Sequence, residues 1–127
     1  MNDNLLRFKN NLNLVIFDYE TCNLNLGLSS NKPWQLAFMV VKDGRITEKQ
    51  DYHLGWEELN VSKDAAKITG FDKKKHDKLA VDPRKALSHF EKYLYDDSFL
   101  KVGHNILGFD IYIHSIHRKL LGLPPAY

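Results

Sequence analysis

The sequence predicts a single mixed α/β domain, and two observations carry that prediction. The first half of the chain holds apolar segments rich in β-branched and aromatic residues, which favour strands. The second half shows apolar residues at helical spacing, interrupted by one short strand-like segment. A chain of 127 residues is long enough to bury one core, so we expect a mixed sheet with flanking helices in one domain over residues 1–127.

Three antiparallel strands are expected first. The run Leu14-Val15-Ile16-Phe17 has the composition of a buried strand. Asp43-Gly44 lies between two apolar segments and indicates a two-residue hairpin turn. The strands are expected at about residues 12–19, 34–41 and 45–54, with a loop rich in Asn, Ser and Gly at 21–32.

Helices and a fourth strand are expected next. Asp82-Pro83 places a capping residue before a proline at the first helical position. Gly70 and Gly122 are plausible helix ends, and Pro124-Pro125 forbids continuation of the last helix. The expected elements are a short helix around 65–68, a helix from 83 to about 96 with its apolar stripe at Ala86, Leu87, Phe90 and Leu94, a strand at 99–102, and a final helix over about 109–121 with Phe109, Ile113, Ile116 and Leu120 on one face.

Composition limits the compartment. Hydrophobic residues make up 43% and charged residues 27%, as in ordinary globular proteins. No apolar stretch approaches the roughly 18 residues of a membrane helix, and the first residues lack the apolar region of a signal peptide. The single cysteine, Cys22, excludes an internal disulfide, and neighbouring acids should keep its thiol protonated. We therefore expect a cytoplasmic protein without membrane contact.

Charge alone does not identify a partner, because the net charge is only +2. Six lysines nevertheless lie within a short stretch: Lys63, Lys67, Lys73, Lys74, Lys75 and Lys78. Such a cluster could follow the phosphates of a nucleic acid, or it could simply be the solvated surface of a helix or loop. The histidines at 53, 76 and 89 show no clustering in sequence and are expected at the surface.

Asp18 and Glu20 end the first apolar run and are the most informative pair in the chain. Residues i and i+2 of a strand point to one face, about 6.5–7 Å apart. Two carboxylates that close repel each other, and a divalent cation would remove the repulsion. The alternative is that both side chains simply face water at the end of the strand. The preceding run suggests a central strand, whose end is where α/β sheets hold ligands.

A third carboxylate, Asp110, stands at the start of the last predicted helix. It would face the acid pair if strand 99–102 lay beside the first strand, or it could merely favour the helix dipole. A rival hypothesis is a transition-metal site from Asp110, His114 and His117, which share a helical face. Against it, one helix seldom supplies a whole site, and His117-Arg118-Lys119 resembles a solvated, basic helix end.

Taken together, these segments carry a resemblance. Asp18-Tyr19-Glu20-Thr21, followed by His104-Asn105 and Phe109-Asp110, resembles the first two motifs of the DnaQ-like (DEDD) 3′–5′ exonucleases, which have an RNase H-like fold. Ile68-Thr69-Gly70-Phe71 and the tail Leu121-Gly122-Leu123-Pro124-Pro125 are also similar to that family. The resemblance covers the chain from about residue 13. Asn105 and Phe109 are one residue further apart than in the commonest form, a spacing that some polymerase-attached members share.

The resemblance implies two-metal hydrolysis of nucleic acids from the 3′ end, as in polymerase proofreading. The cofactor would be two ions of Mg²⁺ or Mn²⁺, with Asp18 contacting both, Glu20 one and Asp110 the other. Thr21 and Phe109 would help hold the terminal nucleotide. The implied partners are single-stranded DNA or RNA 3′ ends, with either a polymerase or a C-terminal remainder of the same domain. The implied source is bacterial or phage-encoded.

The family's third motif is absent from this sequence. It would supply a fourth carboxylate preceded by a His or Tyr base, and no Asp or Glu follows Asp110. The outer strand and final helix of the fold are expected to be missing with it, which would leave an edge exposed at strand 99–102. The chain is thus expected to be the N-terminal portion of an exonuclease domain, incomplete for catalysis. A split protein and a non-catalytic nucleic-acid-binding or assembly module are the alternatives.

Overall fold

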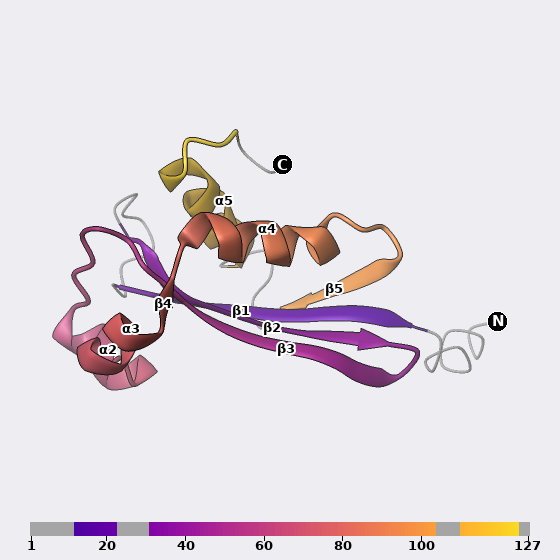
Figure 1. Cartoon of the computed structure of the whole chain (residues 1–127), viewed down its shortest axis with the longest axis horizontal. Coiled ribbons are helices and arrows are strands. Elements are labelled where there is room, and N and C mark those ends of the chain that lie inside the picture. Colours follow the sequence, from indigo (N-terminus) through magenta and orange to yellow (C-terminus); the bar gives the residue numbers. More distant parts are fainter. Residues whose placement is uncertain (1–11, 23–30, 104–109, 125–127) are drawn as a thin grey trace.

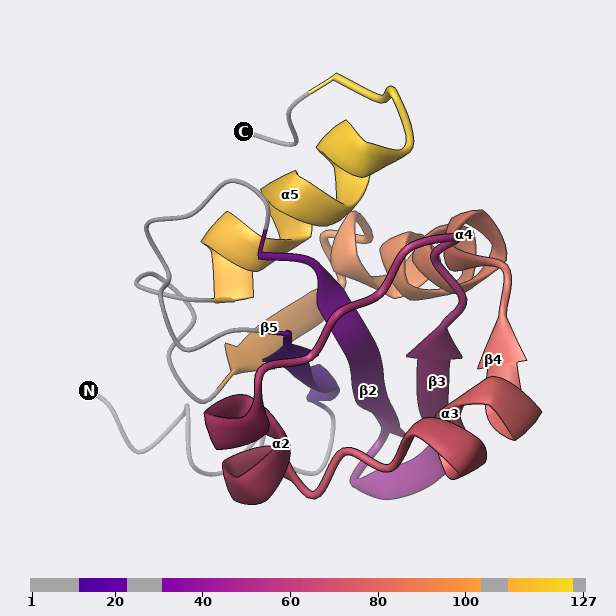
Figure 2. The same ribbon diagram turned by 90° about the vertical axis from the view of Figure 1, so that its left-hand side faces the viewer.

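A five-stranded sheet organises the chain, in the order β4-β3-β2-β1-β5. The computed structural model describes residues 12–22, 31–103 and 110–124. Helices α4 and α5 lie on one side of the sheet, and α2 and α3 lie on the other side at one end (Figures 1 and 2). The strands are β1 (Asn13–Thr21), β2 (Pro33–Lys42), β3 (Arg45–Leu54), β4 (Ala80–Val81) and β5 (Phe99–Gly103); the helices are α2 (Lys63–Thr69), α3 (Lys73–Leu79), α4 (Pro83–Leu94) and α5 (Ile111–Leu120).

Strand pairing confirms the predicted mixed sheet. β2 pairs antiparallel with both β1 and β3, whereas β5 pairs parallel with β1. The hairpin between β2 and β3 turns at Asp43 and Gly44, whose φ angles of 51° and 77° are the positive values that a two-residue hairpin of this kind needs. β4 was not predicted, because two residues paired parallel to the end of β3 leave no periodic pattern.

Alternate side chains of β1 and β2 build the core against α4 and α5. Val15, Phe17 and Tyr19 of β1 are at most 3% exposed. Phe90 of α4 packs on this surface, with ring centroids 4.8 Å from Phe17 and 5.4 Å from Phe38. The predicted stripe of α4 is buried throughout. We call this the covered face of the sheet.

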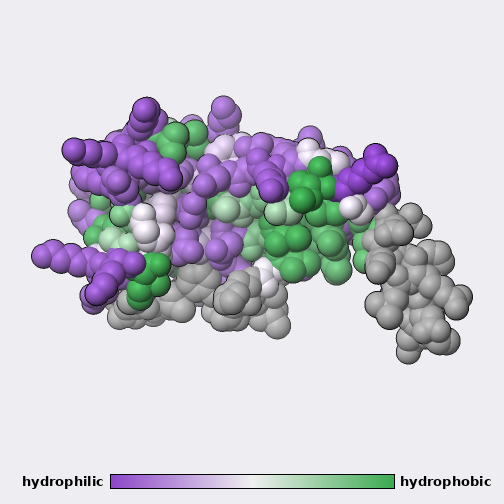
Figure 3. Space-filling model, turned by 90° about the horizontal axis from the view of Figure 1, so that it is seen from below, coloured by the Kyte–Doolittle hydropathy of each residue, from purple (hydrophilic) through white to green (hydrophobic). Residues whose placement is uncertain are grey.

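The opposite face stays exposed away from α2 and α3. It carries Ile16 of β1, Met39 of β2 and Val102 of β5, which lie side by side through the strand register. Ile16 and Val102 are 36% and 38% exposed. Figure 3, which views the molecule from this side, shows hydrophobic residues gathered over the strands. We call it the open face.

Local capping explains the two short helices. Ser62 Oγ accepts a hydrogen bond from the backbone N–H of Ala65, and Gly70 ends α2 with a φ of 77°. Helix α3 was not predicted; it begins where the Asp72 side chain accepts hydrogen bonds from the backbone N–H groups of Lys74 and Lys75. The six clustered lysines lie on α2 and α3 and are all exposed, so they form a solvated basic surface.

The expectation of surface histidines is wrong for His53 and His76. Both are buried, and their Nδ1 atoms lie 3.3 Å apart where α3 packs on β3. His89 is half-buried, and its Nδ1 lies 2.6 Å from the hydroxyl of Tyr52. Residues far apart in sequence make these contacts, which explains why sequence spacing does not show them. In the part of the chain that the structure describes, no helix is long and apolar enough to span a membrane.

A candidate acidic site on strand β1

Strand β1 presents its two acids on the open face, as predicted. Asp18 is exposed and Glu20 is partly buried, while Tyr19 between them points into the core. Asp18 pairs with Ala37 and Glu20 with Gln35 across β2. The strand continues to Thr21, so the acids lie within the last part of β1 and are fixed by pairing with β2.

Asp110 lies at the end of the chain path that leads from β5 into α5. β5 runs parallel to β1 and ends at Gly103, opposite Phe17, so it delivers the chain to the end of the sheet where Asp18 stands. Asp110 is 0% exposed. Its φ and ψ of −63° and −40° are helical, unlike the extended backbone typical of a capping residue. Asp110 makes no side-chain capping hydrogen bond to α5, and a favourable interaction of its charge with the helix dipole stays an open alternative.

The negative charges of Asp18 and Asp110 both affect the ionisation of Glu20. Burial raises the pKa of Glu20, and the negative charges of Asp18 and Asp110 raise it further. Both other acids therefore lie near enough to Glu20 to change its pKa. A cluster of this kind holds its negative charge at a cost, and a divalent cation would lower that cost.

All donors of this cluster are carboxylate oxygens, which fit hard cations such as Mg²⁺ or Mn²⁺. Within the residues described, no three or more His, Cys, Asp or Glu side chains are arranged so that they could hold a metal ion as they stand. The carboxylates are thus suitable ligands in the same region, but they do not form a closed cage. Their side chains would have to converge on an ion when it binds.

The rival transition-metal trio on α5 is contradicted. His114 and His117 are both buried, and other groups hold them. Nε2 of His114 lies 2.7 Å from Oε2 of Glu91 on α4. Nε2 of His117 lies 2.9 Å from the carbonyl oxygen of Pro83. The expectation of a solvated helix end failed because the flanking Arg118 and Lys119 suggest exposure, whereas His117 points inward.

A hydrogen bond that sequence reasoning missed joins β1 to α5. The hydroxyl of Tyr19 lies 3.0 Å from Nδ1 of His117. Burial lowers the pKa of His117 to about 4, so the ring is neutral at pH 7. Because the Pro83 carbonyl can only accept, Nε2 carries the proton and Nδ1 accepts from Tyr19. Nothing in the local sequence around either residue signals this pair.

The two predicted substrate-contacting residues have different outcomes. Thr21 is buried at 6% exposure, next to a register shift in the pairing of β1 with β2. Phe109 lies outside the described residues, as do His104 and Asn105 of the same motif. Roles in holding a nucleotide stay predictions for Thr21 and Phe109.

The thiol of Cys22 is protonated, as expected, but for a different reason. Burial raises its pKa to about 12, and the nearby charge of Lys32 opposes that shift only in part. Burial in the protein, rather than the neighbouring acids, therefore keeps the thiol inert.

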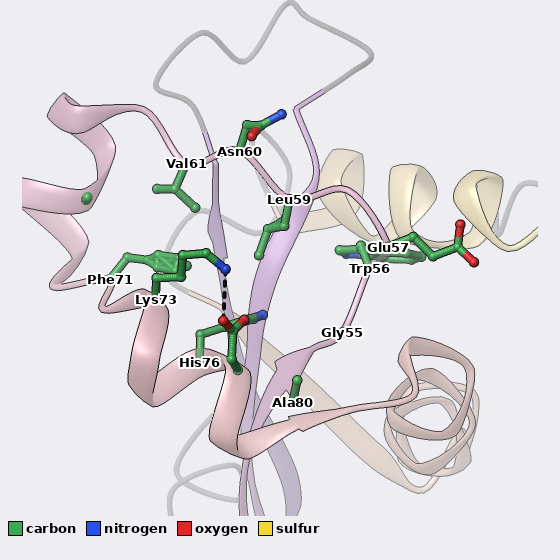
Figure 4. Close-up of a pocket in the computed structure, with 12 residues that line it drawn as sticks. Gly55, Trp56, Glu57, Leu59, Asn60, Val61, Phe71, Lys73, His76 and Ala80 are labelled. Atoms are coloured by element: carbon green, nitrogen blue, oxygen red, sulfur yellow. Dashed lines mark hydrogen bonds and ion pairs between the residues drawn. The ribbon is translucent and has the colours of Figure 1, made fainter.

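The surface has one hollow beside Asp18 and another beside Lys73. A groove of about 670 Å³ crosses the open face and is lined in part by Asp18, Ile16 and Val102. A pocket of about 540 Å³ lies between the segment after β3 and helix α3, with Trp56 and Phe71 among its lining residues (Figure 4). Lys73 and Asp77 form an ion pair of 2.8 Å beside it. No sequence motif marked either hollow, since each is lined by several elements.

Comparison with known proteins supports the fold. No protein-family model matches the sequence, and no curated protein does either. Solved structures of exonuclease I do match: SSB/exonuclease I in complex with an inhibitor at 14% identity, and the E. coli enzyme with a dA16 oligonucleotide at 15%. Both give a TM-score of 0.76 and cover 91% of this chain. The chain spans only 26% and 25% of their respective lengths.

The chain therefore has the RNase H-like fold of these exonucleases, which confirms the predicted fold class. The likeness is to a part of each neighbour. A zinc-bound form of E. coli exonuclease I in complex with single-stranded DNA has the same TM-score of 0.76. At this level of identity, the comparison defines an exonuclease-fold domain and leaves its chemistry to be argued from its own residues.

Proposed function

We propose that this chain is the metal-binding part of a DnaQ-like 3′–5′ exonuclease. The observation that carries the proposal is the shared electrostatic environment of Asp18, Glu20 and Asp110 at the end of β1. The parallel pairing of β5 with β1 supports the proposal, because β5 ends opposite Phe17, next to Asp18.

In this proposal, Asp18, Glu20 and Asp110 would hold two Mg²⁺ or Mn²⁺ ions. Such ions lower the pKa of an attacking water and stabilise the departing 3′ oxygen. The pairing of β1 with β2 orients Asp18 and Glu20, and α5 carries Asp110. No acid follows Asp110 in this sequence, so the complete reaction would need a further carboxylate and a base from outside these residues.

The proposed substrate is a single-stranded 3′ end. The groove on the open face is lined in part by Asp18, so a strand bound in it would lie beside that acid. Structural neighbours include exonuclease I bound to single-stranded DNA and to the C-terminal segment of SSB. By analogy, single-stranded DNA is the first substrate to test, with RNA as the alternative.

Metal binding tests the proposal directly. Calorimetric titration with Mn²⁺ should show affinity falling at least tenfold in Asp18→Ala and in Asp110→Ala, because each removes an oxygen ligand. Asp97→Ala, an exposed acid outside the cluster, is the matched control and should bind as the wild type does. Unchanged affinity in both site variants would contradict the assignment. The 127-residue chain alone should degrade 3′-labelled DNA very slowly or not at all.

The exposed lysines of α2 and α3 favour a second candidate, a non-catalytic nucleic-acid-binding module. It predicts that single-stranded DNA binds with strong salt dependence and indifference to Asp18→Ala. Replacing Lys74, Lys75 and Lys78 with Gln should then reduce the salt slope of binding in fluorescence anisotropy. Binding that needs both metal and Asp18 would favour the nuclease instead.

A further inference from the structure

Two of the polar contacts that hold helix α5 join it to different elements. His114 and Arg118 both bind Glu91, at 2.7 Å, and so fix α5 against α4. His117 instead contacts β1 through its 3.0 Å hydrogen bond with Tyr19. Its second ring nitrogen donates to the carbonyl of Pro83, at 2.9 Å, which fixes the orientation of the imidazole.

Tyr19 and His117 are both near the proposed site acids in the sequence. Tyr19 is the residue between Asp18 and Glu20, and its side chain points through the covered face while theirs point to the open face. His117 follows Asp110 by two helical turns, so both lie on the same side of α5, about 10 Å apart along the axis. The bond thus connects the strand of two acids to the helix of the third.

We propose that the Tyr19–His117 pair is a positioning unit, which sets Asp110 at the working distance from Asp18 and Glu20. This inference rests on the proposed metal-binding function. Neither residue would touch an ion. A metal site made from two elements needs those elements held at a fixed separation. Partners hydrogen-bonded to metal ligands commonly change metal affinity about 10–100-fold when removed, and this pair, one step further from the ligands, is expected at the low end of that range. The pair is fully buried, so water cannot replace the lost contact.

A second tyrosine–histidine pair gives a matched control. The Tyr52 hydroxyl lies 2.6 Å from Nδ1 of His89, also between a strand and a helix, but it joins β3 to α4. Tyr19→Phe and Tyr52→Phe each delete one hydroxyl from such a bond. Tyr19→Phe should loosen the placement of α5 relative to β1, and Tyr52→Phe should not.

The test compares Mn²⁺ affinity and metal-free NMR spectra of the two variants in the 127-residue chain. Tyr19→Phe should raise the Mn²⁺ dissociation constant about tenfold, while Tyr52→Phe should change it less than twofold. In metal-free protein, the side-chain carboxyl ¹³C resonance of Asp110 should shift in Tyr19→Phe and stay in place in Tyr52→Phe. Thermal unfolding of both variants measures the general loss of stability.

His117→Asn keeps the proposal falsifiable if Tyr19→Phe does not fold, because the Asn side-chain oxygen can still accept from Tyr19. It should retain more affinity than His117→Leu. Equal affinity in Tyr19→Phe and wild type, or equal losses in Tyr19→Phe and Tyr52→Phe, would overturn the positioning role. If Asp18→Ala and Asp110→Ala also left affinity unchanged, the proposed function itself would fall. Loss in the acid variants alone would overturn only the present inference.

Discussion

Alternate residues of β1 lie on opposite faces of the sheet and differ in burial and in role. On the covered face, Phe17 and Tyr19 of β1 are buried, and both rings pack against Phe90 of α4. On the open face, Ile16, Asp18 and Glu20 keep contact with solvent or with one another's charge. A strand whose side chains alternate can therefore be a stability element on one side and a candidate site on the other.

This division explains why acids can be held in an unfavourable cluster. Burial and hydrogen bonds on the covered face hold β1 in place. Repulsion between carboxylates arises on the open face, where it can be tolerated because β1 is already fixed. Substitutions on the covered face should therefore change stability strongly, and acid substitutions on the open face should change ligand binding with little loss of stability.

The largest expected stability effect separates the two faces. Phe90→Ala removes a fully buried ring that contacts Phe17 and Phe38, and should lower the free energy of unfolding by about 3–5 kcal/mol. Ile16→Ala on the open face, where the side chain is 36% exposed, should cost about 1 kcal/mol. Urea unfolding measures both. Equal losses would show that the open face is covered in solution.

A smaller effect is expected from Glu91, which joins α4 to α5. Burial alone would raise its pKa, but hydrogen bonds from His114 and Arg118 outweigh burial and lower it. A lowered carboxyl pKa stabilises the fold above the unfolded value, near 4.5, and this contribution is lost as pH falls through the folded value. Glu91→Gln should cost about 2 kcal/mol at pH 7.

Unfolding curves from pH 7 down to pH 3 test this sign. The difference between wild type and Glu91→Gln should shrink as the pH falls. A difference that stays constant across the scan would contradict the ionic role of Glu91.

The smallest effect has the opposite sign and belongs to the open face. The pKa of Glu20 is raised by burial and by the two neighbouring acids. Its contribution to stability is thus fully present below the unfolded pKa, near 4.5, and is lost as pH rises through the folded value. Glu20→Gln should therefore stabilise the metal-free protein at pH 7 by less than about 1 kcal/mol.

Thermal unfolding in EDTA at pH 4 and pH 7 measures this effect. The variant should gain on the wild type only at the higher pH. A loss of stability at pH 7 would mean that the charge of Glu20 is favourably held without metal.

Features with a short period or a local cause were predictable from sequence. The two-residue period of β1 placed Asp18 and Glu20 on one face, and positive φ at Gly70 ended α2 as its glycine suggested. Helix α3 lacked an apolar stripe, because four of its seven residues are lysines and its packing depends on His76 against β3. His117 was misjudged for a similar reason: its neighbours are basic, and its partners Tyr19 and Pro83 are distant in sequence.

The central claim is that the three acids on β1 and α5 bind a divalent cation together. Adding Mn²⁺ to ¹⁵N-labelled protein locates the ion, because the paramagnetic ion broadens nearby amide resonances. The account predicts that the amides of Asp18, Glu20 and Asp110 broaden first, while those of α2 and α3 persist, and that Asp18→Ala removes the effect. Broadening centred on His53 and His76, or no localised broadening at all, would contradict it.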